Sequence, residues 1–121
     1  MSGWDDLIKY AEKTSARIDE VASAIKIELF NGIVDDTRVD TGRLKGNWSI
    51  QNGKFTKVIL NTFDKNGAKV KNRIKQRSKP DTITFFTNNL PYAIVMELKD
   101  GMVARNVARI KSIIKKEAAK K

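Results

Sequence analysis

Residues 39–49 read V-D-T-G-R-L-K-G-N-W-S and mark the point where the hydrophobic periodicity of the chain changes. After the D-T-G triplet, apolar or small side chains alternate with polar ones, a period of two that is typical of a half-buried antiparallel strand. On this alternation Leu44, Trp48 and Ile50 point the same way. The change of period therefore predicts a turn at 40–42 that leads a strand into a hydrophobic core, with Gly46 leaving room for a close neighbour.

The chain upstream of this turn has helical periodicity. Apolar residues recur every three or four positions from Trp4 to about Ile33, which predicts a long helix within residues 1–36. We expect this helix to pack on a small antiparallel sheet.

The chain downstream of the turn carries further strand signals. Asn52-Gly53 predicts a tight turn, and residues 55–60 read as the returning strand of a hairpin. The run T-I-T-F-F-T at 82–87 is rich in β-forming residues and predicts another strand. Residues 92–98 fit a strand or a helix by pattern alone.

Two more helices follow from apolar spacing. Val70 and Ile74 form an i, i+4 pair that predicts a short basic helix over about 65–76, and residues 102–118 repeat apolar side chains at helical spacing. We therefore expect one α+β domain over residues 1–121: a long helix at 1–36, a sheet at 40–98 with the inserted basic helix, and a C-terminal helix at 101–119.

The composition removes several classes of catalytic site. The 121 residues include no cysteine and no histidine, so disulfides, thiolate nucleophiles, Cys/His zinc sites and Ser-His-Asp triads are excluded. We expect no enzyme activity and no cofactor or metal. No apolar run approaches the roughly 18 residues that span a bilayer, and Met1–Lys9 does not resemble a signal peptide.

The net charge of +10 is distributed unevenly along the chain. Residues 1–41 hold 5 Lys/Arg and 9 Asp/Glu, whereas residues 42–121 hold 19 and 5. Such asymmetry indicates contact with nucleic acid or with an acidic protein surface, including that of a neighbouring copy. A solubilising surface explains the lysines about equally well.

The Asp-Thr-Gly triplet is also the catalytic triplet of aspartic proteases. Those enzymes need two carboxylates that share one proton. Arg38 and Arg43 flank Asp40, and nearby cations keep a carboxylate ionised. We therefore interpret Asp40, Thr41 and Gly42 as a structural turn.

Two groups of residues are candidates for interaction surfaces. The first is a basic surface for assembly or DNA contact, which contains no interleaved aromatic residue and so suits phosphates better than bases. Its members are Lys65, Lys69, Lys71, Arg73, Lys75, Arg77 and Lys79. The second is a set of candidate subunit contacts, namely Trp48, Tyr92, Glu97 and Met102. For Glu97 the sequence leaves two alternatives: a buried ion pair with Arg43 or Arg105, or a position facing solvent.

Three stretches taken in order resemble a known protein family. They are VDTGRLKGNW at 39–48, TFFTNNLPYAIVMELKDG at 84–101 and GMVARNVARIKSII at 101–114. This ordered set is similar to the tail-completion, or neck, proteins of tailed bacteriophages. Relatives often have a longer loop before the Gly-Met-Val, where this chain has only Leu98-Lys99-Asp100.

The resemblance implies a structural virion protein at the head-proximal end of the tail, assembled in the host bacterial cytoplasm. It implies a homo-oligomeric ring, expected to be a hexamer, between tail-terminator or tail-tube and head-completion proteins. Non-specific contact with DNA in the channel is also expected. No contact with a membrane is expected. A tail-terminator or head-completion ring subunit is the first alternative, and a small basic nucleic-acid-binding protein is the second. Within a ring, Asp19, Glu20 and Asp36 would face the basic 65–79 region of the next copy.

Overall fold

The computed structural model describes residues 18–80 and 82–119, with side chains for 22–80 and 82–116. This part of the chain forms five helices and a two-stranded antiparallel sheet, which confirms the predicted α+β fold. The elements are α2 (Ile18–Asp36), α3 (Arg43–Gly46), β1 (Trp48–Asn52), α4 (Ala68–Arg77), β2 (Thr84–Asn88), α5 (Ala93–Asp100) and α6 (Met102–Ala119). The predicted beginning of the long helix, residues 1–17, lies outside the described residues.

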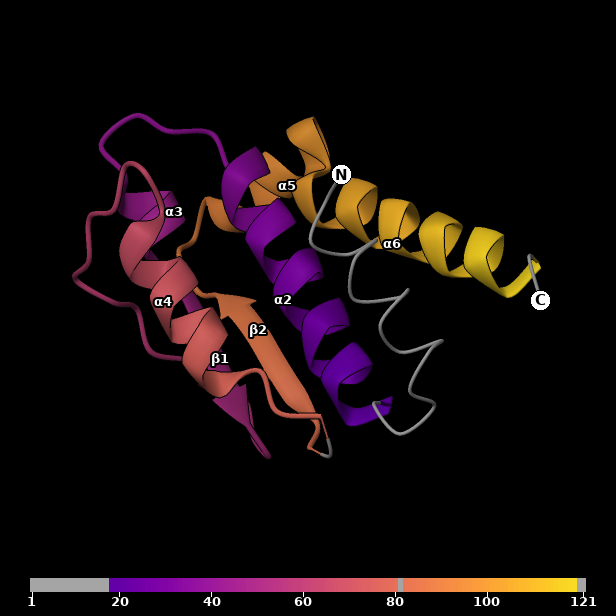
Figure 1. Ribbon diagram of the computed structural model, residues 1–121. Coiled ribbons are helices and arrows are strands. Elements are labelled where there is room, and N and C mark those ends of the chain that lie inside the picture. The colour runs from indigo at the N-terminus through magenta and orange to yellow at the C-terminus, as the bar shows by residue number, and fades with distance from the viewer. Residues whose placement is uncertain (1–17, 81, 120–121) are drawn as a thin grey trace.

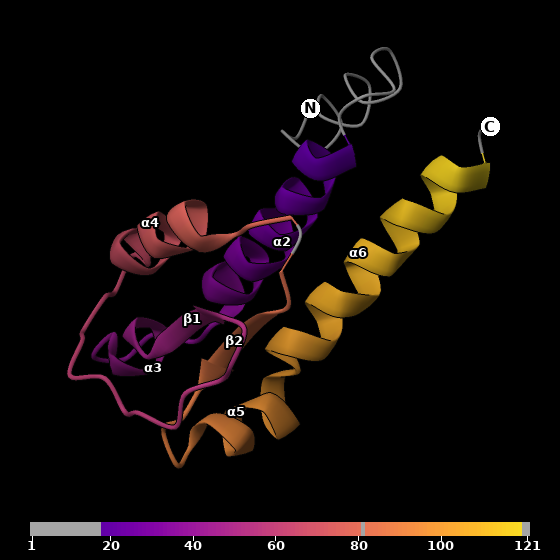
Figure 2. The ribbon, with the colours of Figure 1, turned by 90° about the horizontal axis from the view of Figure 1, so that it is seen from below.

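Helices α2 and α4 cover one face of the sheet. Helix α2 lies between α4 and α6, and α6 packs along α2 and extends away from the strands (Figures 1 and 2). The Phe30 ring stacks on Phe86 with centroids 4.4 Å apart, and Phe86 stacks on Trp48 at 4.8 Å. This run of three rings joins α2 to both strands, as the predicted packing of the long helix on a sheet requires.

The main core is the space between these helices and the sheet. Its buried members come from four elements, α2, β1, α4 and α6, so one cluster connects most of the described chain. They are Phe30, Ile33, Val34, Trp48, Ile50, Val70, Ile74 and Met102.

The predicted strand begins later than the alternation indicates. Residues 43–46 form the single helical turn α3, in which the Gly46 N–H donates to the Gly42 carbonyl at 2.9 Å. Gly42 has φ +87°, a conformation that reverses the chain and that glycine adopts without strain. Leu44 is buried in a second, small cluster with Leu90 and Ala93.

The predicted hairpin is wrong. Residues 55–60 form no strand, and β1 pairs instead with β2, in a register from Trp48 opposite Asn88 to Asn52 opposite Thr84. The segment after β1 crosses the face of the sheet away from α2, where Phe55 lies against Phe85 with ring centroids 6.0 Å apart. The strand predicted over 82–87 is confirmed as β2.

The connection from β1 to α4 passes close to α3. An added Cβ on Gly46 would lie 2.4 Å from the Thr62 carbonyl oxygen, so only glycine fits beneath this connection. The room predicted at Gly46 is therefore filled by the chain itself.

The remaining helices follow the apolar spacing. Helix α4 buries Val70 and Ile74 as predicted, and its first turn is capped by Asp64, which accepts the Val70 N–H at 3.0 Å. The segment 92–98, whose pattern fits a strand or a helix, lies almost entirely in helix α5. The predicted C-terminal helix is confirmed as α6.

Candidate interaction surfaces

The Asp40–Gly42 turn is held by backbone groups and by Thr41. The Gly42 carbonyl accepts the N–H groups of Gly46 and Asp64, both at 2.9 Å, and the Thr41 hydroxyl accepts the Arg43 N–H at 3.3 Å. Within residues 22–80 and 82–116, no hydrogen bond reaches the exposed Asp40 carboxylate. Thr41 and Gly42 thus shape the turn, while Asp40 is presented to solvent.

A hollow of about 250 Å³ lies between this turn and the beginning of α5. Leu44 and Met96 supply apolar lining, and Tyr92 lies beside them. The charged groups around the hollow are Arg38, Asp40 and Arg43. The fold therefore joins the D-T-G-R segment to the P-Y-A-I-V-M segment, half the chain away.

Helix α5 exposes an apolar outer face beside this hollow. Ile94, Val95 and Leu98 are 68%, 51% and 82% exposed. The opposite side of α5 packs Ala93 and Met96 on Leu44 and Leu90. An eight-residue helix with an apolar exposed face is typical of a surface that another protein covers.

Glu97 caps helix α6. Its two carboxylate oxygens accept the N–H groups of Val103 at 2.8 Å and Ala104 at 3.1 Å, at the positive end of the helix dipole. The sequence suggests that Glu97 forms an ion pair with Arg43 or Arg105, or faces solvent. Within the described residues its carboxylate instead accepts two backbone N–H groups. Glu97 therefore links α5 to the first turn of α6.

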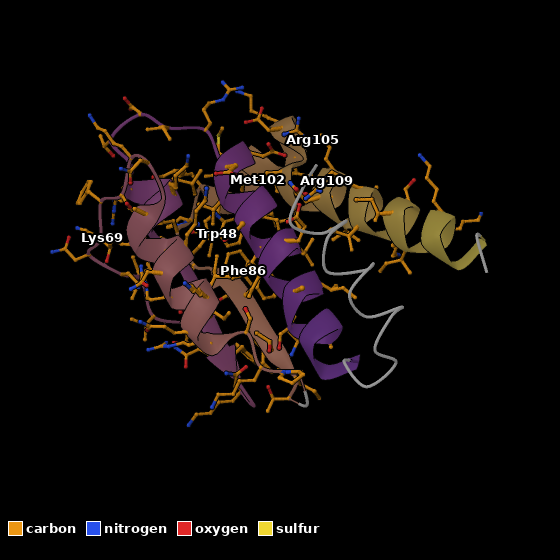
Figure 3. All side chains as sticks on the ribbon, in the orientation of Figure 1. Trp48, Lys69, Phe86, Met102, Arg105 and Arg109 are labelled. Carbon is orange, nitrogen blue, oxygen red and sulfur yellow. The ribbon has the colours of Figure 1, made fainter. Side chains whose placement is uncertain are left out.

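The other predicted subunit contacts divide between core and surface. Trp48 and Met102 are 5% and 1% exposed and belong to the main core (Figure 3). The Trp48 indole N–H donates to the Thr37 hydroxyl at 2.9 Å. Trp48 thus lies in the core that the alternation predicts, and neither Trp48 nor Met102 is exposed for a subunit contact in the single chain, whereas Tyr92 is exposed beside the hollow.

The predicted basic surface divides into inward and outward cations. Lys71 pairs with Asp35 of α2, and the Arg77 guanidinium donates to the Ile50 carbonyl at 3.2 Å. Arg73 is half-buried. The side chains that are exposed and form neither an ion pair nor a hydrogen bond within the described residues are those of Lys65, Lys69, Lys75 and Lys79, and Lys69 points away from the body in Figure 3.

The acidic residues of α2 also find partners within the chain. Asp36 accepts a hydrogen bond from Asn106 at 2.8 Å and lies 4.0 Å from Arg105. Glu28 pairs with Arg109 at 3.3 Å. Asp36 therefore faces α6 of its own chain, whereas the side chains of Asp19 and Glu20 lie outside the described residues.

No protein-family model, curated protein or solved structure matches this chain. Among the helices of residues 18–80 and 82–119, none is long and apolar enough to cross a membrane.

Proposed function

We propose that the chain is a structural subunit of the neck of a tailed bacteriophage, which completes the tail or joins it to the head by assembling into a ring. The proposal combines the three-part sequence resemblance with the apolar outer face of α5. That face carries the proposal, because Ile94, Val95 and Leu98 lie on one side of a helix with no cover among the described residues.

The position of this face supports a role in assembly. The hollow beside it has apolar lining from Leu44 and Met96 and charged groups around it, which is the composition of a pocket that receives a partner side chain. Two of the three resembling segments, 39–48 and 84–101, meet there. An assembly role explains why these segments occur together.

Further exposed apolar side chains near α5 support an assembly role. Phe55, Val58 and Ile59 are exposed in the connection after β1. The Asn89 amide, four residues before α5, donates to the Thr56 carbonyl at 2.9 Å and to the Val58 carbonyl at 3.0 Å, so this connection lies beside the beginning of α5. The apolar surface that a partner could cover is therefore larger than α5 alone.

The expected self-association is measured by native mass spectrometry and by light scattering over a range of protein concentrations. Leu98→Asp places a charge in the α5 face and should abolish the oligomer. Ile83→Asp is the matched control, because Ile83 is 73% exposed and precedes β2. A monomer at every concentration, or equal loss with both variants, would contradict ring assembly through α5.

The role in the virion is tested by electron microscopy of particles produced without this protein. DNA-filled heads beside unattached tails are the expected result. Tails of irregular length would favour the tail-terminator alternative instead. Normal infectious virions in the absence of the protein would contradict the proposal.

A further inference from the structure

An open groove lies between α4 and the chain that precedes it. Its volume is about 630 Å³, and its lining combines amide, hydroxyl, aromatic and cationic side chains. The lining residues are Asn61, Thr62, Phe63, Lys69, Asn72 and Arg73. Neither α5 nor the hollow at Asp40 contributes to this groove.

Phe63 gives the groove an exposed aromatic ring. The side chain is 50% exposed although Phe63 lies next to buried Asp64, so the ring is not part of either hydrophobic cluster. The basic stretch itself contains no aromatic residue, and the fold supplies one from the preceding segment. An exposed ring beside cations is the arrangement on which unpaired bases stack.

Arg73 gives the groove an unsatisfied donor. Its Nη2 atom is shielded from solvent and has no hydrogen-bond partner within the described residues. A buried guanidinium nitrogen without an acceptor is costly. Because Nη2 is shielded, the Arg73 side chain must turn toward the groove before this atom can donate a charge-assisted hydrogen bond to a phosphate oxygen there.

The charges around the groove favour an anion. Lys69 lines it, and Lys65 and Lys75 are exposed at nearby positions of the same segment. Two carboxylates that contact α4 are already engaged, Asp64 by the Val70 N–H and Asp35 by Lys71. The groove is therefore a basic surface with local carboxylates directed elsewhere.

We propose that this groove binds single-stranded nucleic acid. Arg73 and Lys69 contact backbone phosphates, one base stacks on Phe63, and Asn61 and Asn72 offer amide groups to the same nucleotide. An acidic polypeptide would use the cations but would leave the ring and the amides without partners. The proposal does not depend on ring assembly, since it rests on different elements of the chain.

Fluorescence anisotropy with a labelled oligothymidine, titrated at several salt concentrations, tests this site. Phe63→Ala should weaken binding about 5- to 150-fold, the range expected for loss of one stacked base. Phe55→Ala is the matched control, because Phe55 is an exposed aromatic residue outside the groove, and its affinity should be unchanged.

The electrostatic part is tested by removing single charges. Lys69→Gln should lower the slope of log affinity against log salt by about 0.7, the value for one phosphate contact to a single strand. Lys111→Gln, on the exposed side of α6, should leave the slope unchanged. Lys69 is exposed, so this variant keeps the fold even if Arg73→Gln does not.

Five results would overturn the proposal, the first four of which concern the single strand and its variants. These four are no binding at low salt, equal losses with Phe63→Ala and Phe55→Ala, equal slopes for Lys69→Gln and Lys111→Gln, and equally effective competition by polyglutamate. Duplex DNA that binds as tightly as the single strand and is insensitive to Phe63→Ala would also overturn it. Leu98→Asp should not change the affinity, which separates this site from the assembly surface.

Discussion

Helices α4 and α5 are both exposed on their outer sides, but they are anchored very differently. Helix α4 inserts Val70 and Ile74, 1% and 0% exposed, into the main core of eight buried residues. Helix α5 contributes only Ala93 to a cluster of three buried residues, with Leu44 and Leu90. The charged helix is thus firmly attached, while the apolar helix is lightly attached.

This difference fits two kinds of surface. A helix that presents charges to a polyanion benefits from a rigid base, since each cation must keep its place without help from burial. A helix with an apolar outer face gains its missing burial when a partner covers it. We therefore expect α5 to be the less stable element in the free chain and to be stabilised on assembly.

The largest effect on the free energy of unfolding should come from shortening a buried side chain beneath each helix. Ile74→Ala should lower the free energy of unfolding by about 2 to 5 kcal/mol, because a fully buried side chain leaves a cavity in a packed core. Leu90→Ala should cost about 2 kcal/mol or less, since its small cluster borders solvent and can collapse. Urea denaturation followed by circular dichroism measures both.

Amide hydrogen exchange sharpens the same test. Leu90→Ala should increase exchange in α5 while α4 stays protected, whereas Ile74→Ala should increase exchange throughout the described chain. Equal protection of α4 and α5 in the unmodified protein would show that the two helices are equally well anchored, and would contradict the comparison.

An intermediate effect should come from the cap that joins α5 to α6. Glu97→Ala removes the acceptor of two backbone N–H groups and should cost about 0.5 to 2 kcal/mol. Lys99→Ala is the control, because Lys99 is exposed on the same helix and forms no ion pair within the described residues. Thermal unfolding of the two variants separates capping from helix propensity, and equal melting temperatures would rule out the cap.

Local periodicity was sufficient to predict the helices and the strand whose apolar pattern lies within their own residues. Val70 and Ile74 predicted α4, and the T-I-T-F-F-T run predicted β2. The pattern predicts strand for residues 43–46, which form α3, because Leu44 and Trp48 are four residues apart. That spacing puts both residues on one side of a strand and nearly on one side of a helix, so it cannot distinguish α3 from an early strand.

The failures share a physical cause, which is that the deciding partner is distant in sequence. Asn52-Gly53 indicates a local hairpin, but β1 gains more by pairing with β2, whose Phe86 completes the aromatic stack. Likewise, Phe63 reaches the groove through the path of a connection without regular structure. The cap by Glu97 was hidden because it lies five residues before α6, outside the usual capping-box position.

The smallest effect should come from the ion pair that links α2 to α4. Lys71 and Asp35 are 35% and 57% exposed at their side chains, so solvent screens their attraction. Asp35→Asn should lower the free energy of unfolding by less than about 1 kcal/mol, and the loss should shrink at high salt. Chemical denaturation at two salt concentrations measures it. Because Val70 and Ile74 anchor α4 independently of this pair, oligothymidine binding should persist in Asp35→Asn, and its loss would mean that the ion pair positions the groove.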